Sequence, residues 1–334
     1  MRFLAPILLC LGFVVLLTGC EGDAFTKVVD VELDDPEILP VLYADWSTSD
    51  TVLYVIVTET LGVLDEDDRV QGLPNLRVTL QVDGGPPIAF SERSDGFFDI
   101  RFSSNAGASN GTYYALVRPA NFLAGAEVNL TVAGLPDGGV MTAAGRLPSE
   151  AVAQVTRLTE PTRDTVWFDP SDPDQGYYIQ SSGGELSLRF DDAANEPNYY
   201  QFFRVDALVE STNDSLLYEN SDLLYGRDED TRFQYVENGV VFRDVIDDGR
   251  SIELTFDYYG NNVGVPQDST TLEQREFVYI TTLTESTYSY LFELDQLNLN
   301  EGNPFAEPIV LGSNVEGGLG HLLLRTVGPS TRYK

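Results

Sequence analysis

The sequence has 334 residues, of which 43% are apolar, and its formal net charge at pH 7 is −33. This apolar content is enough to build packed cores and excludes a disordered chain. The acidic excess argues against nucleic acid as a partner, because binding to phosphate needs clustered cations. The length favours two domains over one.

The chain begins MRFLAPILLCLGFVVLLTGC, where one cation, Arg2, precedes an apolar run from Phe3 to Leu17. This pattern indicates a secretory signal peptide, and the run is too short for a transmembrane helix of about 20 residues. The small residues just before Cys20 make the segment resemble a bacterial lipobox. That resemblance implies a lipoprotein signal over residues 1–20 and acylation at Cys20 by fatty acids such as palmitate. The alternative is an ordinary export signal with an incidental cysteine.

The cysteine content agrees with a lipoprotein, since the chain contains only Cys10 and Cys20. Export would remove the first and lipidation would consume the second. The mature chain would then hold no disulfide, no thiolate metal site and no cysteine nucleophile. We expect a protein that is anchored to a membrane by its acyl chains, outside the cytoplasm, with residues 21–27 as a short tether.

Short runs from residue 28 onwards alternate apolar and polar residues, which indicates strands with one buried face. The clearest runs are residues 75–82, 97–102 and 127–132. Turn-rich segments such as VDGGPP and GLPDGG separate the runs, which favours an antiparallel β-sandwich. We assign this first domain to residues 28–160 and expect a linker near Pro161, in the segment TEPTRDT.

A second set of strand-like runs follows the linker, at residues 185–190, 199–208, 251–259 and 276–283. The apolar period then changes to helical spacing in Tyr290, Leu291, Leu294 and Leu297. We expect a helix at about 285–298 that packs this stripe on the second sandwich. The predicted fold is therefore all-β, with two antiparallel β-sandwich domains, the second at 161–334, and one helix near the C-terminus.

Residue types that carry catalysis or bind metal are sparse. The single histidine, His321, begins an apolar run and has no G-x-S-x-G segment to serve, so we expect a strand-edge residue. The best calcium-like run is DPSDPDQG, where Asp172 and Asp174 are weak metal-ligand candidates and a surface turn is the simpler interpretation. We expect no metal, cofactor or catalytic residue. The many acidic residues neither reveal nor exclude the paired carboxylates of a glycosidase.

The segment NPFAEPIVLGSNVEGGLG, residues 303–320, has three glycines within four residues. It does not match the G-x-x-x-x-G-K-[ST] phosphate loop, and it follows a predicted helix, whereas a dinucleotide-binding loop follows a strand. Its Asn and Gly residues suit a turn with positive φ. We expect this turn to return the chain to a last strand, HLLLRTV, with Gly317 or Gly318 at positive φ and His321 at or next to the strand start.

The same segment is similar to the closing motif of the Bacteroidota lipoproteins known as domain of unknown function 4249. The matching positions are Phe305, Pro308, Asn314, Gly317, Gly318 and Gly320. The lipobox and the segments GTYYALV, TAAGRLP and NEPNYYQFFRV also resemble that family, so the resemblance spans the mature chain. His321 departs from it, because an apolar or aromatic residue is expected there. The resemblance implies an outer-membrane lipoprotein of β-sandwich domains, the first immunoglobulin-like, and it supplies no catalytic residue.

Members of that family are often encoded beside TonB-dependent outer-membrane receptors, which implies a shared role in substrate capture or import. We therefore expect a non-enzymatic accessory or binding protein on the cell-surface or periplasmic face of the outer membrane. The alternatives are a carboxylate-dependent surface hydrolase such as a glycosidase, and a structural or adhesive lipoprotein. A β-sandwich fold alone does not decide among them.

Overall fold

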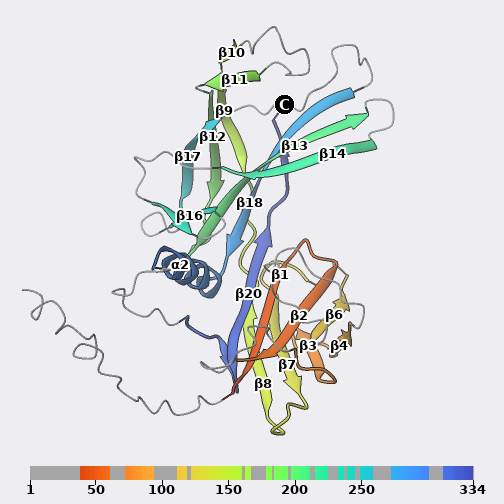
Figure 1. Ribbon diagram of the computed structural model, residues 1–334. Helices are drawn as coiled ribbons and strands as arrows, with labels where there is room; N and C mark the ends of the chain where they lie inside the picture. Colours follow the sequence, from red (N-terminus) through yellow and green to blue (C-terminus); the bar gives the residue numbers. More distant parts are fainter. Residues whose placement is uncertain are drawn as a thin grey trace, which may run out of the picture. The chain divides into compact units, whose positions relative to one another are not determined.

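The computed structural model (Figure 1) describes part of the chain, and all of that part belongs to the larger of its two compact units, Ile38–Leu61 with Asp65–Lys334. The described residues are 38–60, 72–93, 111–118, 122–159, 162–166, 178–182, 184–194, 197–210, 215–224, 232–236, 239–244, 249–258, 272–300 and 311–333. The predicted signal peptide, the tether and the strand-like run at 97–102 lie outside them.

Two sheets pack face to face in the N-terminal part of the chain. One sheet contains, in order, β1 (Pro40–Ser47), β2 (Val52–Glu59), β6 (Thr112–Leu116) and β5 (Ser91–Glu92). The other has the order β19 (Val315–Glu316), β8 (Val140–Arg146), β7 (Glu127–Ala133), β3 (Arg77–Val82) and β4 (Ile88–Ala89). The predicted alternation is confirmed in β3, where Val78 and Leu80 are buried and Arg77 and Gln81 are exposed.

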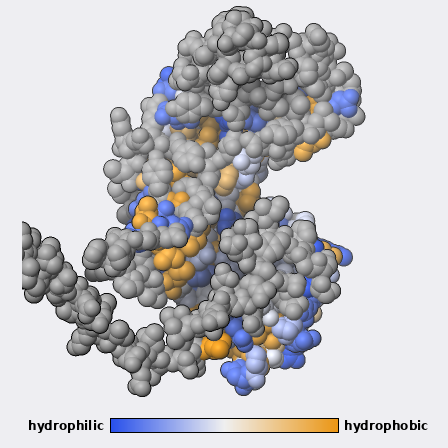
Figure 2. Space-filling model, in the orientation of Figure 1, coloured by the Kyte–Doolittle hydropathy of each residue, from blue (hydrophilic) through white to orange (hydrophobic). Residues whose placement is uncertain are grey.

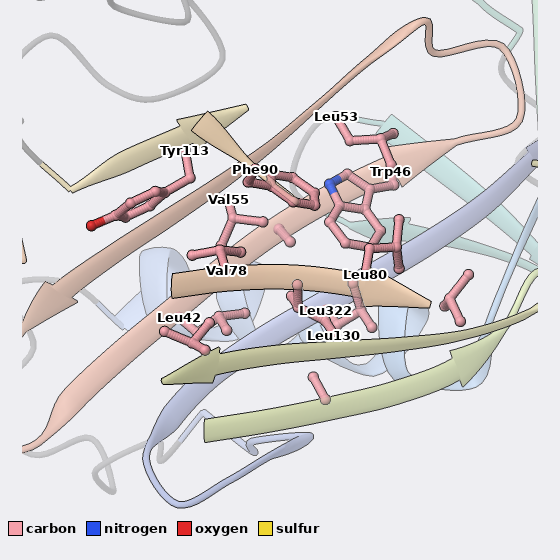
Figure 3. Close-up of a cluster of buried hydrophobic side chains, with 14 of the residues drawn as sticks. Leu42, Trp46, Leu53, Val55, Val78, Leu80, Phe90, Tyr113, Leu130 and Leu322 are labelled. Atoms are coloured by element: carbon pink, nitrogen blue, oxygen red, sulfur yellow. The ribbon is translucent and has the colours of Figure 1, made fainter. Parts of the chain in front are cut away.

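Side chains from both sheets form one hydrophobic core, shown in Figure 3. Trp46 is fully buried there, and its indole N–H donates to the carbonyl oxygen of Tyr54 at 2.8 Å. The hydroxyl of buried Tyr113 donates to the carbonyl of Leu73 at 2.7 Å and accepts from the N–H of Leu76 at 3.0 Å. The polar atoms of these large side chains are thus paired inside the core, so burying them carries little desolvation cost.

The C-terminal part forms a second pair of facing sheets. A three-stranded sheet has the order β17 (Ser251–Tyr258), β12 (Gly184–Asp191) and β9 (Gln154–Thr159). It shares an aromatic core with β16 (Gly239–Arg243), β13 (Tyr199–Glu210) and β18 (Leu272–Leu283), beside which lie β15 (Phe233–Val236), β14 (Ser215–Leu223) and β21 (Thr331–Arg332). The rings in this core include Phe190, Tyr200, Phe202, Phe242 and Phe256. A separate two-stranded sheet pairs β10 (Thr162–Val166) with β11 (Tyr178–Ser182).

The last long strand, β20 (Leu319–Val327), pairs with strands of both parts. Residues 319–325 run parallel to residues 41–47 of β1, and residues 325–327 run antiparallel to residues 281–283 of β18. Strand β20 therefore joins the two parts in one 11-stranded sheet. Among the pairings of the described strands, β1–β20 is parallel and the others are antiparallel, so the predicted antiparallel sandwiches are correct apart from this strand.

The predicted division at residue 160 remains a prediction, and two segments cross it. Strand β9, which precedes it, pairs with β12, and nearby Ala151 and Ala153 lie in the second core. Strand β20, which follows it, places Leu322 and Leu324 in the first core. The expected linker TEPTRDT contains the end of β9 and the start of β10. The immunoglobulin-like character of the first sandwich also remains a prediction.

The predicted helix is confirmed as α2 (Glu285–Asn300). The Thr284 hydroxyl accepts the N–H of Thr287 at 3.2 Å, which caps the helix N-terminus. The predicted apolar stripe was wrong in its C-terminal half, because Leu297 is 40% exposed and the buried residues are Thr287, Tyr288 and Leu291. Bonds from Thr287 to β20 set this rotation of the helix, and periodicity does not reveal them. Within the described residues, no helix is long and apolar enough to cross a membrane.

Candidate functional site: the C-terminal motif

The structure brings together four of the residues singled out in the sequence. Asn314, Gly317 and Gly318 lie between α2 and β20, and Gly320 is the second residue of β20, next to His321. Five other residues lie outside the described part of the chain, and their predicted roles stay predictions: Cys20, Asp172, Asp174, Phe305 and Pro308.

Asn314 takes the place of a neighbouring strand along β20. Its side-chain Oδ1 accepts the N–H of Leu322 at 2.8 Å, and its Nδ2 donates to the carbonyl oxygen of the same residue at 2.8 Å. The backbone N–H of Asn314 also donates to the carbonyl of Gly320 at 3.3 Å. These bonds satisfy backbone groups of β20 that point away from β1 and lie beyond the end of its pairing with β18.

Thr287 does the same two residues further along β20. Its hydroxyl accepts the N–H of Leu324 at 2.9 Å and donates to the carbonyl of Leu324 at 3.1 Å. The backbone N–H of Thr284 donates to the same carbonyl at 3.2 Å. Thr287 is fully buried, so these bonds form in a water-excluded site. We use the name edge seal for the pair Asn314 and Thr287.

The motif glycines are needed because backbone from other strands passes directly over them. Gly317 has φ of 77°, which confirms the predicted positive φ, and Gly320 has φ of 118°. A Cβ on Gly320 would overlap the carbonyl oxygen of Leu42, and one on Gly318 would lie 2.7 Å from the carbonyl oxygen of Pro40. Asn314 is not at positive φ, so its place in the motif reflects its side-chain bonds. The glycines therefore admit this chain's own backbone, and the interpretation as a structural turn fits them better than a ligand cradle.

His321 lies inside β20, at its third residue, so the strand begins two residues before the predicted start. Its side chain is buried under α2, with its ring 4.2 Å from that of Tyr290. Tyr43 on β1 is its paired neighbour, and Glu293 is the charged group of α2 that acts on it. Burial lowers the pKa of His321, and the negative charge of Glu293 opposes that effect.

The lowered pKa of His321 makes stability depend on pH. The unfolded chain takes up a proton at this residue near its ordinary pKa of about 6.5, while the folded chain does so only at lower pH. The stabilisation is therefore complete above about pH 6.5 and is lost as the pH falls through that value toward the folded pKa. We expect wild type to lose on the order of 1 kcal/mol more than His321→Phe between pH 7 and pH 5, measured by urea unfolding. Equal losses would show that His321 does not titrate differently in the folded state.

Removing the Thr287 hydroxyl should show how much the edge seal contributes to the free energy of unfolding. In Thr287→Val the shape is kept, but a buried N–H and C=O of Leu324 lose this partner, so we expect a loss of about 3 kcal/mol of unfolding free energy. Thr159→Val, at an exposed position of β9, is the control and should change stability by less than about 0.5 kcal/mol. Similar small losses in both variants would mean that water or another donor replaces the hydroxyl.

Sequence reasoning missed a buried polar cluster at one end of the second sandwich. The carboxylate of Asp192 accepts hydrogen bonds from the hydroxyl of Tyr200 at 2.5 Å, the side-chain amide of Asn198 at 3.1 Å and the N–H of Gly249 at 2.8 Å. Burial raises the pKa of Asp192, which the Tyr200 and Gly249 bonds oppose and nearby Asp244 reinforces. These bonds tie together the loops around β12, β13 and β17. The sequence shows only that this Asp follows a strand-like run, and many acidic residues share that position.

No group of three His, Cys, Asp or Glu side chains in the described segments is arranged to hold a metal ion. The site is thus defined by the backbone of β20, the edge seal and the motif glycines.

The described part of the chain has an all-β fold with one helix. Its closing Asn-Gly motif supplies hydrogen bonds to the backbone of the last long strand, β20. A family model described as "Domain of unknown function (DUF4249)" matches residues 26–328, and the chain belongs to that family. A search of curated proteins found no match.

Proposed function

We propose that this protein is a lipid-anchored accessory or binding protein of the outer membrane that partners a TonB-dependent receptor in substrate capture or import. The observation that carries the proposal is the N-terminal sequence, in which a short apolar run ends in small residues and Cys20. An acylated Cys20 would hold the folded part at a membrane surface.

The partner role is supported by the family to which the chain belongs and by its fold. The family resemblance implies that such proteins are encoded beside receptors of this class, and the β-sandwich fold is compatible with a binding role. The large negative charge favours association with a partner surface that carries exposed cations.

The proposal predicts that the acylated protein co-purifies with a β-barrel receptor from native membranes. The tagged full chain would be isolated in mild detergent, and bound proteins would be identified by mass spectrometry. Because salt screens the attraction between complementary charges, recovery of the receptor should fall when the salt concentration is raised. A chain carrying Cys20→Ser is the control and should recover much less receptor from the membrane fraction.

Isolation of the acylated protein without any receptor, at low salt and from cells grown on several nutrients, would contradict this function. Loss of cell attachment with intact nutrient uptake, on deletion of the gene, would favour the adhesive alternative instead.

A further inference from the structure

Three exposed apolar side chains gather at one end of the first sandwich. Ile38 is 60% exposed, Val140 is 49% exposed and Leu319 is 40% exposed. We call these three residues the apolar rim. Large exposed aliphatic groups that lie together on a folded domain mark contact surfaces more often than scattered ones do.

The packing of the motif brings the rim residues together. Leu319 pairs with Val41 across β1 and β20, and the adjoining Gly318 lies against the carbonyl of Pro40, two residues from Ile38. Gly317, in turn, lies against the carbonyl of Val140. The rim therefore surrounds the Gly317–Gly318 turn, and near the bottom of Figure 2 small hydrophobic patches stand beside hydrophilic surface.

The position of the rim along the chain indicates what it contacts. Ile38 is the first described residue, and only residues 21–37 separate it from Cys20. A fully extended segment of that length reaches at most roughly 60 Å, and a relaxed one reaches much less. An acyl anchor at Cys20 would therefore hold this end of the sandwich, where the tether joins it, within reach of the membrane.

We infer that the apolar rim rests on the lipid surface, with Ile38, Val140 and Leu319 in the interfacial layer; this rests on the proposed anchoring at Cys20. Apolar side chains at a membrane surface enter the boundary between headgroups and acyl chains. Exposed Asp137 and Glu316 at the same end outnumber exposed Arg77, which pairs with Ala133 beside Val140, so the fitting surface is a neutral, zwitterionic one. Contact at this end would fix the orientation of the molecule on the membrane.

Depth-dependent quenching tests this orientation in the full acylated chain. Single substitutions Ile38→Cys, Val140→Cys and Leu319→Cys would each be labelled with a nitrobenzoxadiazole fluorophore, and the proteins bound to phosphatidylcholine vesicles that contain spin-labelled lipid. Leu116→Cys is the control, because Leu116 is 74% exposed and pairs with Val52, at the opposite end of β2 from the pairing of Glu59 with Pro40.

We expect quenching at the three rim positions to be roughly threefold or more stronger than at the control position, because interfacial side chains lie within about 10 Å of the acyl boundary. Vesicles rich in phosphatidylglycerol should reduce the difference. Ile38 lies outside any strand, so its variant reports on the rim even if a strand substitution disturbs folding.

Equal quenching at rim and control positions, in protein that floats with the vesicles, would overturn the rim contact and leave the anchoring intact. Protein that does not float with vesicles would overturn the anchoring and, with it, the rim contact. A fluorescence change at the rim that requires a receptor instead of lipid would assign this surface to a protein partner and would overturn the inference.

Discussion

Gly320→Ala should prevent folding of the first sandwich or cost at least about 4 kcal/mol of unfolding free energy. Gly320 combines φ of 118° with a backbone contact that leaves no room for a Cβ, since that atom would overlap the carbonyl oxygen of Leu42. Relief would require β20 to separate from β1, and that pairing holds Leu322 and Leu324 in the first core. The measurement is urea unfolding followed by circular dichroism.

Gly134→Ala is the matched control for that substitution. Gly134 also has positive φ, at 92°, but a Cβ there would meet nothing within 4 Å. The Gly134→Ala variant should lose only about 1–2 kcal/mol of unfolding free energy, from backbone strain. If the two variants lost the same stability, backbone conformation alone would explain the motif glycines, and the close approach of β1 would be irrelevant.

Cys20→Ala should release the protein from membranes almost completely. The described residues contain no membrane-spanning helix, and the three rim side chains bury far too few methylene groups to replace acyl chains, each of which contributes about 0.8 kcal/mol per methylene. The measurement is the fraction of protein that sediments with membranes after a wash at high salt.

Cys10→Ala is the control for the Cys20 substitution and should leave membrane attachment unchanged, because Cys10 lies inside the predicted signal peptide. Persistent attachment of the Cys20→Ala variant would show that something other than lipid at that residue holds the protein.

The sequence predicted individual elements better than their assembly. Alternation located β3, β7 and β12, and the change of period located α2, because these signals depend on neighbours along the chain. Strand β20 shows the limit. Its apolar run HLLLRTV predicts a buried strand, but nothing in the run says that its first residues pair in parallel with β1, nearly 280 positions earlier.

The candidate site, too, could be predicted only in part. The motif glycines could be assigned to a turn because glycine has a local reason to adopt positive φ, as Gly317 does. The role of Asn314 was missed, since its partner Leu322 depends on how the turn folds back. Thr287 gave no signal at all, because a threonine in the first turn of a helix is ordinary and its bonds to Leu324 arise only from tertiary packing.

The proposed function depends first on the anchor, and the mass of the mature N-terminal peptide tests it most directly. Protein isolated from native membranes would be digested and the N-terminal peptide analysed by mass spectrometry. The account predicts a peptide that begins at Cys20 and carries thioether-linked diacylglycerol together with an N-acyl chain. A peptide that begins elsewhere, or one with an unmodified Cys20, would contradict it.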